Sequence, residues 1–330
     1  MKRVISSILM LSGVLAAQQF AKVAQAGAKF LSIPMSPRAV GMGETFVSVA
    51  DDPYTVFINP AGIANVRTKA VATTMLPYWV DTYVGGLAFV APGKAGNYGV
   101  FLGGLMSTGF KEYKLEENGD ITEGSTFSYT AMQMGVSYAQ YFTDKFSTGL
   151  SLKGVYEGYG PYASAWTFAV DVGTYYKTGF RDLTIAMSMQ NFGPDLKPSG
   201  TYIRWTYEQG AIKGDSSAEF STYPLPLLFR AGMSMSLWKT EYQGLLLAAE
   251  ITHPNDNVES YAIGMEYNLF NMLYLRAGNK FMIQETENAP LFGGFSGGLG
   301  LSFFRGQVDY SFSDMGSLPD LHRIGLSFSF

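Results

Sequence analysis

Very few side chains in this sequence have the type and spacing that chemistry on a substrate requires. Residues 294–298 match the G-x-S-x-G pattern of a hydrolase nucleophile, centred on Ser296. That pattern needs a strand-to-helix turn with a histidine and an acid nearby, whereas this stretch is glycine-rich and predicts a strand. The two histidines, His253 and His322, lack metal-ligand spacing, and there is no cysteine. We therefore expect neither an enzyme nor a bound metal or cofactor.

Charged side chains on the predicted strands follow a period of two. Lys153 shares one face of its strand with Ser151, while Leu150 and Leu152 occupy the other face. A charge that faced lipid at the mid-bilayer would cost about 2–4 kcal/mol. Eight strand charges obey this parity: Lys153, Asp171, Arg230, Glu250, Glu266, Arg276, Asp309 and Arg323. Four are positive and four negative, which favours a salt-bridged filling of a narrow lumen; the alternative is a lined route for permeation.

The strands that carry these charges belong to a predicted set of fourteen. We predict them at residues 69–78, 82–92, 96–110, 123–138, 146–158, 163–178, 181–191, 225–237, 243–253, 258–269, 272–280, 293–304, 306–313 and 321–330. The last strand alternates apolar and small residues and ends on Phe330, as the closing strand of an outer-membrane barrel does. The fold class is therefore all-β: a transmembrane, antiparallel, up-and-down β-barrel of about 14 strands over residues 69–330.

The connections between the predicted strands alternate in length. Most turns on one side are tight, whereas residues 111–122, 192–224 and 281–292 form longer gaps that carry acids and glycine. Short periplasmic turns and longer outer loops are typical of bacterial outer-membrane barrels. We expect the protein to lie in that membrane with lipid around its outer face.

The N-terminus has the order of a secretory signal peptide. Lys2 and Arg3 precede an apolar run, and small residues follow. We expect residues 1–26 to be the signal, cleaved after Ala26, with a site near Ala16 as the alternative. Cleavage would remove Lys22 as well and lower the formal charge from -4 to -7. This acidic balance argues against nucleic acid as a partner.

Residues 27–68 do not alternate and predict a small plug or hatch segment ahead of the barrel. The side chains that suit this role are Arg38, Gly41, Gly43, Asp51, Asp52, Asn59, Pro60, Ala61 and Gly62. The two glycines allow close backbone packing, and the paired aspartates before Pro53 suit a capped turn. An asparagine followed by proline predicts a short helix through Ala64. Sealing the barrel and gating it are both open interpretations.

Residues 29–64 resemble the N-terminal segment of the PorV/PorQ family, outer-membrane proteins of the FadL-like barrel superfamily. The matching features are Arg38-Ala39 before Gly41-Met42-Gly43, then Ala50-Asp51-Asp52 and Asn59-Pro60-Ala61-Gly62. The resemblance implies a non-enzymatic role in type IX protein secretion. Members of the family accept cargo from a translocon and pass it to a sortase-type attachment enzyme, or anchor a partner protein. Residues 192–224, 111–122 and 281–292 would then contact the translocon, the enzyme or cargo C-terminal domains.

A second hypothesis is a FadL-like transporter that admits hydrophobic small molecules. It predicts an apolar pocket inside the outer mouth and a gap in the barrel wall. The apolar run at residues 225–229 could line such a pocket or simply begin a strand. The balanced lumen charges favour the secretion role over the transporter.

Overall fold

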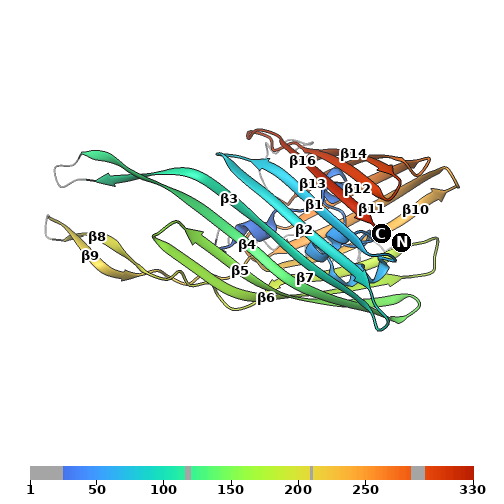
Figure 1. The fold of residues 1–330 in the computed structure, drawn as a ribbon, viewed down its shortest axis with the longest axis horizontal. Helices are drawn as coiled ribbons and strands as arrows, with labels where there is room; N and C mark the ends of the chain where they lie inside the picture. Colours follow the sequence, from blue (N-terminus) through green and yellow to red (C-terminus); the bar gives the residue numbers. More distant parts are fainter. Residues whose placement is uncertain (1–24, 116–119, 209–210, 284–293) are drawn as a thin grey trace, which may run out of the picture.

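A computed structural model describes residues 25–115, 120–208, 211–283 and 294–330. Fourteen antiparallel strands close into one barrel in the order β1-β16-β15-β14-β13-β12-β11-β10-β7-β6-β5-β4-β3-β2, and β8 and β9 form a separate two-stranded sheet (Figure 1). The first strand pairs with the last, Ala70 opposite Ser329, which leaves the barrel without a free edge. No helix in the described ranges is long and apolar enough to cross a membrane.

Seven wall strands, β1–β7, precede the long connection, and seven, β10–β16, follow it. The strand bounds are β1 Ala70–Tyr78, β2 Thr82–Pro92, β3 Asn97–Leu115, β4 Ile121–Thr143, β5 Phe146–Tyr159, β6 Ala163–Lys177, β7 Thr184–Phe192, β8 Thr201–Glu208, β9 Ala211–Glu219, β10 Leu228–Lys239, β11 Gln243–Pro254, β12 Ser260–Leu269, β13 Leu273–Met282, β14 Phe295–Phe303, β15 Gly306–Ser313 and β16 Leu321–Ser329.

The two halves of the barrel wall are joined by the long connection that carries β8 and β9, with seven wall strands on either side of it. Side chains alternate along each wall strand between the interior and the lipid face. In β5, Leu150 and Leu152 are each 52% exposed, whereas Ser151 and Lys153 between and beside them are buried. The alternation arises because successive side chains of a strand point to opposite faces. The apolar outer face and polar inner face confirm the predicted transmembrane barrel.

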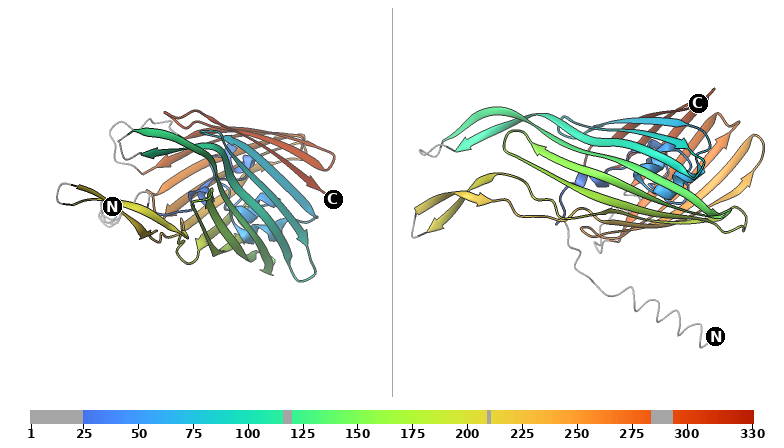
Figure 2. Two further views of the ribbon diagram at one scale, coloured as in Figure 1. Left: turned by 60° about the vertical axis from the view of Figure 1, so that its left-hand side comes forward. Right: turned by 60° about the horizontal axis from the view of Figure 1, so that its bottom comes forward.

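The predicted number of wall strands is confirmed, but two predictions about the outer connections are wrong in detail. β3 and β4 extend beyond the predicted ends, so that the predicted loop at 111–122 is largely strand. The predicted loop at 192–224 contains the β8–β9 hairpin. Both hairpins project from the same end of the barrel (Figure 2). We call this end the outer end, because long connections of such barrels face outward.

Two sequence predictions fall on residues outside the described ranges. The predicted signal peptide, residues 1–26, lies there except for its last two residues, and most of the predicted outer loop at 281–292 lies there as well.

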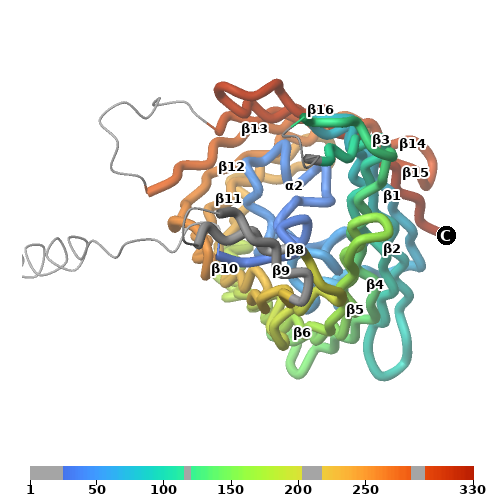
Figure 3. The backbone as a smooth tube through the Cα atoms, turned by 90° about the vertical axis from the view of Figure 1, so that its left-hand side faces the viewer, coloured from blue at the N-terminus to red at the C-terminus, as the bar shows by residue number. Residues whose placement is uncertain are grey.

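The N-terminal segment, residues 25–69, lies inside the ring of strands (Figure 3). It consists of η1 (Lys29–Ser32), α2 (Pro37–Gly41), η2 (Pro53–Phe57) and η3 (Pro60–Asn65). Gly27 donates to the Pro224 carbonyl near the outer end, whereas the Ile63 and Val66 carbonyls accept from Asn97 at the periplasmic start of β3. The segment therefore passes through the lumen from the outer to the periplasmic end.

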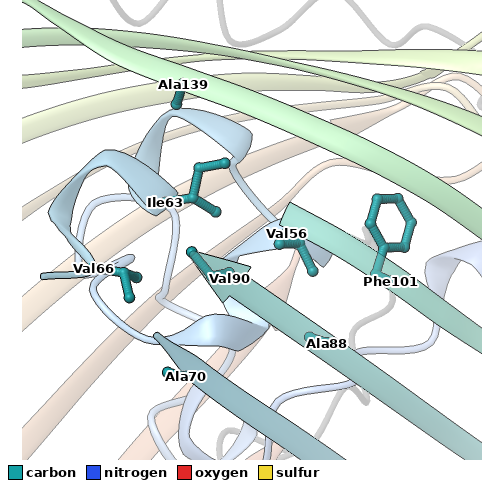
Figure 4. Close-up of a cluster of buried hydrophobic side chains, with 8 residues drawn as sticks. All are labelled: Val56, Ile63, Val66, Ala70, Ala88, Val90, Phe101 and Ala139. Carbon is teal, nitrogen blue, oxygen red and sulfur yellow. The ribbon is translucent and has the colours of Figure 1, made fainter. Parts of the chain in front are cut away.

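Apolar packing seats the periplasmic half of this segment against the wall. Val56, Ile63 and Val66 pack on side chains from β1 to β4, among them Val90 and Phe101 (Figure 4). Each of these five side chains is at most 6% exposed. Burying a Val, Ile or Phe side chain contributes about 1.5–3 kcal/mol, so the cluster is a hydrophobic core within the barrel.

Candidate functional site

Arg276 on β13 contacts two carboxylates. One of these two carboxylates also contacts the N-terminal segment. Its Nε atom lies 2.6 Å from Glu266 and its Nη1 atom 2.6 Å from Asp309. The Glu266 carboxylate also accepts two hydrogen bonds from Arg38, at 2.7 and 2.8 Å. Two-point contacts between guanidinium and carboxylate are among the stronger protein hydrogen bonds. This cluster fastens α2 to β12, β13 and β15.

The two adjacent aspartates of the N-terminal segment, Asp51 and Asp52, make different contacts. Asp51 lies 2.6 Å from Nη1 of Arg38. Asp52 accepts from the Tyr54 backbone and so caps η2, as the sequence predicts for this pair. Burial raises the pKa of the Asp52 carboxyl, although nearby Arg38 opposes that shift.

A second fastening uses backbone donors of the segment. Glu250 on β11 lies 2.9 Å from Arg230 on β10 and accepts from the backbone N–H groups of Phe46 and Val47, at 2.9 and 3.0 Å. A buried carboxylate needs several donors to offset its desolvation, and here one cation and two N–H groups supply them.

A third fastening joins Glu44 to Lys280 on β13, at 2.7 Å. Burial alone would raise the pKa of Glu44, but Lys280 and Arg230 lower it overall. The carboxylate of Glu44 is therefore held in its charged form by these cations.

Glycines permit the close contact between the segment and this wall. The Cβ atom of a residue in place of Gly41 would lie 3.0 Å from the Gly298 Cα atom, and in place of Gly278 it would lie 2.2 Å from the Gly43 backbone nitrogen. Gly43 also has a positive φ of 69°, which glycine adopts at little cost. The prediction that Gly41 and Gly43 serve close packing agrees with these distances.

The motif at residues 59–62 forms the base of the segment. Asn59 caps η3 by accepting from the Ala61 backbone, and its amide donates to the Val47 and Thr174 carbonyls. Pro60 is the first residue of η3, and this 3-10 helix ends at Asn65. A Cβ atom on Gly62 would lie 2.5 Å from the Ala50 side chain.

Lys153 and Asp171 form a separate pair on the far side of the lumen, 2.8 Å apart. Asn191 at the end of β7 joins both, accepting from Lys153 at 2.6 Å and donating from its backbone to Asp171 at 2.7 Å. Its side-chain amide donates to the Pro226 carbonyl. This network ties β5, β6 and β7 to the start of β10 rather than to the N-terminal segment.

Arg323 on β16 is the exception among the eight predicted lumen charges. It is 3% exposed, and its Nε atom is buried without a hydrogen-bond partner. In the part of the chain that the structure describes, no carboxylate lies within 4.0 Å of its guanidinium. The other seven charges all lie in ion pairs.

Sequence reasoning missed Glu44 and Lys280, and it also missed Glu157 and Asn191 in the interior. Glu157 on β5 is 2% exposed and accepts from the Tyr129 and Tyr223 hydroxyls, at 2.6 and 3.3 Å. It lies four residues after Lys153, so the same parity rule could have found it. Asn191 had no such signal, because it depends on a positive φ of 64° and on a register shift in the β6–β7 pair.

The outer half of the lumen also contains apolar surface. Phe30, Leu31 and Ile33 of the N-terminal segment pack near Val155 and Leu225. A second cluster gathers Met35, Leu76, Val84 and Leu321, with Ile33 and Trp79 packed against it. A small cavity of about 20 Å³, room for about one water molecule, lies beside Leu31, Met35 and Phe57.

The residues that superficially suggested chemistry serve structural contacts. Ser296 lies in β14, where its hydroxyl accepts from the Gly43 backbone at 3.0 Å. His253 lies 3.0 Å from Glu259, and His322 lies 2.7 Å from the Tyr310 hydroxyl. Within the described ranges, no three His, Asp or Glu side chains are arranged to bind a metal ion.

Comparison with solved structures identifies similar folds. The CymD monoaromatic hydrocarbon channel has a TM-score of 0.57 at 13% identity, over 90% of this chain and 97% of that one. The toluene transporter TodX of Pseudomonas putida has a TM-score of 0.57 at 13% identity, over 89% and 97%. A FadL homologue of Pseudomonas aeruginosa has a TM-score of 0.53 at 11% identity, over 90% and 99%.

No family model and no curated protein matches the sequence. The finer resemblance to the PorV/PorQ family is therefore not confirmed by these comparisons. Two of these similar structures are a hydrocarbon channel and a toluene transporter. Together with the closed 14-strand barrel, they place this chain in the outer membrane, with the fold of FadL-like β-barrels.

Proposed function

We propose that this barrel is a channel through which small hydrophobic molecules cross the outer membrane. The supporting observation is the apolar packing in the outer half of the lumen, where Phe30, Leu31 and Ile33 of the N-terminal segment pack near Val155 of β5 and near Leu225, which precedes β10. Water-filled channels of this class have polar interiors. An apolar lining instead suits a solute that leaves water on entry.

Passage requires the N-terminal segment to shift, because it fills the lumen from end to end. The segment is fastened mainly to β10–β14 by ion pairs. Toward β1–β5 it makes apolar contacts through Val56 and Phe57 and hydrogen bonds such as those from Asn97, but no ion pair among the described residues. Apolar contacts are non-directional, so we expect the route to open along β1–β5.

A disulfide lock tests this function. A Cβ atom at Gly99 would lie 3.0 Å from the Val56 Cγ1 atom, about the 3 Å that separates a Cβ atom from the partner sulfur in a disulfide. The chain has no cysteine of its own. The Val56→Cys, Gly99→Cys double variant should therefore form one defined crosslink between segment and wall.

The measurement is uptake of radiolabelled toluene by cells that express the protein in an outer membrane without other hydrophobic channels. We expect wild type to take up toluene several-fold faster than cells without the barrel. Toluene uptake by cells with the oxidised double variant should fall to the background rate, and reduction of the disulfide should restore uptake. Each single cysteine variant is the control. If cells with the wild-type protein took up toluene no faster than cells without the barrel, the channel proposal would be wrong.

A second candidate is the secretion role that the PorV/PorQ resemblance implies. The observation that favours it is the projection of the β3–β4 and β8–β9 hairpins beyond the outer end (Figure 2). Their length offers a surface for a translocon, an attachment enzyme or cargo C-terminal domains. In native membranes, a tagged protein with residues 110–127 replaced by a tight turn should lose a co-purifying translocon or cargo that full-length protein retains. Absence of both from the full-length sample would remove this candidate.

A further inference from the structure

We propose that Glu157 on β5 is the binding site for the α-ammonium group of the mature chain, which begins at Gly27 once the signal peptide is removed. Cleavage after Ala26 is the prediction from the sequence, because small residues precede this bond. The inference concerns the first residue of the N-terminal segment. It is independent of the channel proposal, because it involves none of the contacts of Val56 and Phe57 on which the opening of the route depends.

Glu157 differs from the other buried carboxylates of the wall that the structure describes. It is 2% exposed, and its partners among the described residues are the neutral hydroxyls of Tyr129 and Tyr223. The other four carboxylates each lie within 2.6–2.9 Å of a lysine or arginine: Asp171, Glu250, Glu266 and Asp309. A buried charge is costly unless it is paired and hydrogen-bonded. The two hydroxyls supply hydrogen bonds to Glu157, and a cation is still missing.

The lysines closest in sequence to Glu157 and to the start of the mature chain are already in ion pairs. Lys153, on the same face of β5, lies 2.8 Å from a carboxylate of β6. Lys29 in η1 lies 2.6 Å from a carboxylate that follows β11. The residues directly opposite Glu157 on β4 and β6 are Ala131 and Ala165, which carry no charge. The neighbouring strands therefore leave Glu157 without a cation.

The backbone of Gly27 lies beside the hydroxyl end of the Tyr223 side chain. Its N–H group donates to the Pro224 carbonyl at 3.0 Å. A Cβ atom at position 27 would lie 1.8 Å from the Cε2 atom of Tyr223, the ring carbon next to the one that carries the hydroxyl. That hydroxyl lies 3.3 Å from the Glu157 carboxylate. The position therefore requires glycine, and one tyrosine side chain contacts both the start of the mature chain and Glu157.

A second set of contacts brings the same two residues together. Ala28, which follows Gly27, is 2% exposed and belongs to a buried cluster with Ala131 and Val155. Ala131 lies directly opposite Glu157, and Val155 shares the inner face of β5 with it. The first residues of the mature chain are therefore packed against the part of β5 that carries Glu157.

Cleavage of the signal peptide creates a cation at this place. A signal peptidase hydrolyses the bond between Ala26 and Gly27 with one water molecule, which leaves a carboxylate on Ala26 and an amine on Gly27. The amine binds a proton at neutral pH, since free α-amino groups have a pKa of about 7.7–8.0.

The new ammonium group and Glu157 also match in hydrogen bonding. An ammonium group has three N–H donors, of which one can keep the bond to the Pro224 carbonyl. The departure of Ala26 leaves room for the other two. A carboxylate can accept about four hydrogen bonds, and Glu157 accepts two from the tyrosine hydroxyls. An uncut chain has only a neutral amide here, so the ion pair forms only when the mature chain begins at Gly27.

The test measures the pKa of the Gly27 α-amino group in the folded mature protein. Competitive acetylation at a series of pH values, followed by mass spectrometry of the N-terminal peptide, gives this pKa. We expect a value above about 9, because a carboxylate nearby favours the charged form of an amine. Glu157→Gln should lower it to the range of a free α-amino group, about 7.7–8.0. The matched control is Glu219→Gln, an acid on β9 that is 70% exposed, which should leave the pKa at the wild-type value.

A chain that keeps Ala26 as its first residue moves the charge and leaves the wall unchanged. Its ammonium group lies one residue, about 3.8 Å along the chain, from the position of the Gly27 nitrogen, so its pKa should be that of a free α-amino group. Heat-modifiable migration in electrophoresis verifies that each variant is folded.

Two results would overturn the proposal. One is a first residue other than Gly27 in protein isolated from native membranes, read by mass spectrometry of the intact chain. The other is a wild-type pKa in the free range that Glu157→Gln does not change. Neither result bears on toluene uptake, which tests the channel separately.

Discussion

Two buried arginines of the barrel wall, Arg276 on β13 and Arg323 on β16, have opposite surroundings. Arg276 on β13 contacts two carboxylates at 2.6 Å, and one of these also receives Arg38 from the N-terminal segment. Arg323 on β16 has no carboxylate within 4.0 Å among the described residues. The two arginines have the same parity and nearly the same burial. Their environments differ because Glu266 and Asp309 on neighbouring strands contact Arg276, whereas the carboxylate of Glu44 acts on Arg323 from beyond 4.0 Å.

This difference predicts opposite responses to loss of charge at the two arginines. A cation whose partners all belong to the chain stabilises one arrangement of the lumen, since each partner removed leaves a buried charge. A buried cation without a carboxylate in contact offsets less of its own desolvation cost. We therefore expect substitutions around Arg276 to lower the free energy of unfolding. We expect loss of the charge of Arg323 not to lower it.

The largest expected effect is at the fastening. Arg276→Gln removes the cation between Glu266 and Asp309 and should destabilise the barrel by about 3–5 kcal/mol, the usual cost of breaking a buried pair. Urea unfolding in lipid vesicles measures this change. Loss of less than about 1 kcal/mol would show that the cluster does not fasten the lumen.

The next effect tests the close contact on the same wall. Gly278→Ala places a methyl group 2.2 Å from the Gly43 backbone nitrogen and should cost about 1–3 kcal/mol, as overpacking does. Gly297→Ala is the matched control on β14, because the atom nearest to its added methyl group, the Arg276 carbonyl oxygen, would be 3.8 Å away. Equal stability of the two variants would contradict the close seating of the segment.

An increase in stability, in place of a decrease, is expected when the charge of Arg323 is removed. Arg323→Gln removes a buried charge that has no carboxylate in contact and should stabilise the barrel, by about 1–3 kcal/mol if the whole penalty of an unsatisfied group is relieved. The same urea titration compares it with Arg276→Gln. Destabilisation on the scale of Arg276→Gln would mean that Arg323 has a partner and that the contrast between the two arginines is false.

The smallest effect is expected at an exposed pair beside the outer hairpin. Lys197 lies 2.9 Å from Glu219, and their side chains are 55% and 70% exposed; exposed pairs contribute about 0–1 kcal/mol. Lys197→Gln should therefore lower the free energy of unfolding only slightly in the same urea titration. A loss well above about 1 kcal/mol would show that this pair fastens the structure.

Period-two alternation was sufficient to predict the barrel, the number of its strands and the inward direction of all eight charges. It works because lipid on one face excludes charge along the whole strand. Alternation along one strand does not fix register, so the partner of each charge could not be read from the sequence. Arg276 and Arg323 look alike in the sequence and differ only in what lies opposite them.

The structure adds features that local patterns do not encode. The β8–β9 hairpin lies in a stretch that was predicted as loop, because a ribbon outside the membrane has no lipid face to impose alternation. Asn191 joins the Lys153–Asp171 pair only through its positive φ and the register shift beside it. In the N-terminal segment, the caps at Asp52 and Asn59 could be predicted, because a helix cap depends on residues adjacent in the sequence.

The most direct test of the contrast between the two arginines compares the free energies of unfolding of Arg276→Gln and Arg323→Gln, measured by urea titration in lipid vesicles. We predict that Arg276→Gln lowers the free energy of unfolding by about 3–5 kcal/mol and that Arg323→Gln does not lower it. Equal losses in the two variants would contradict the account.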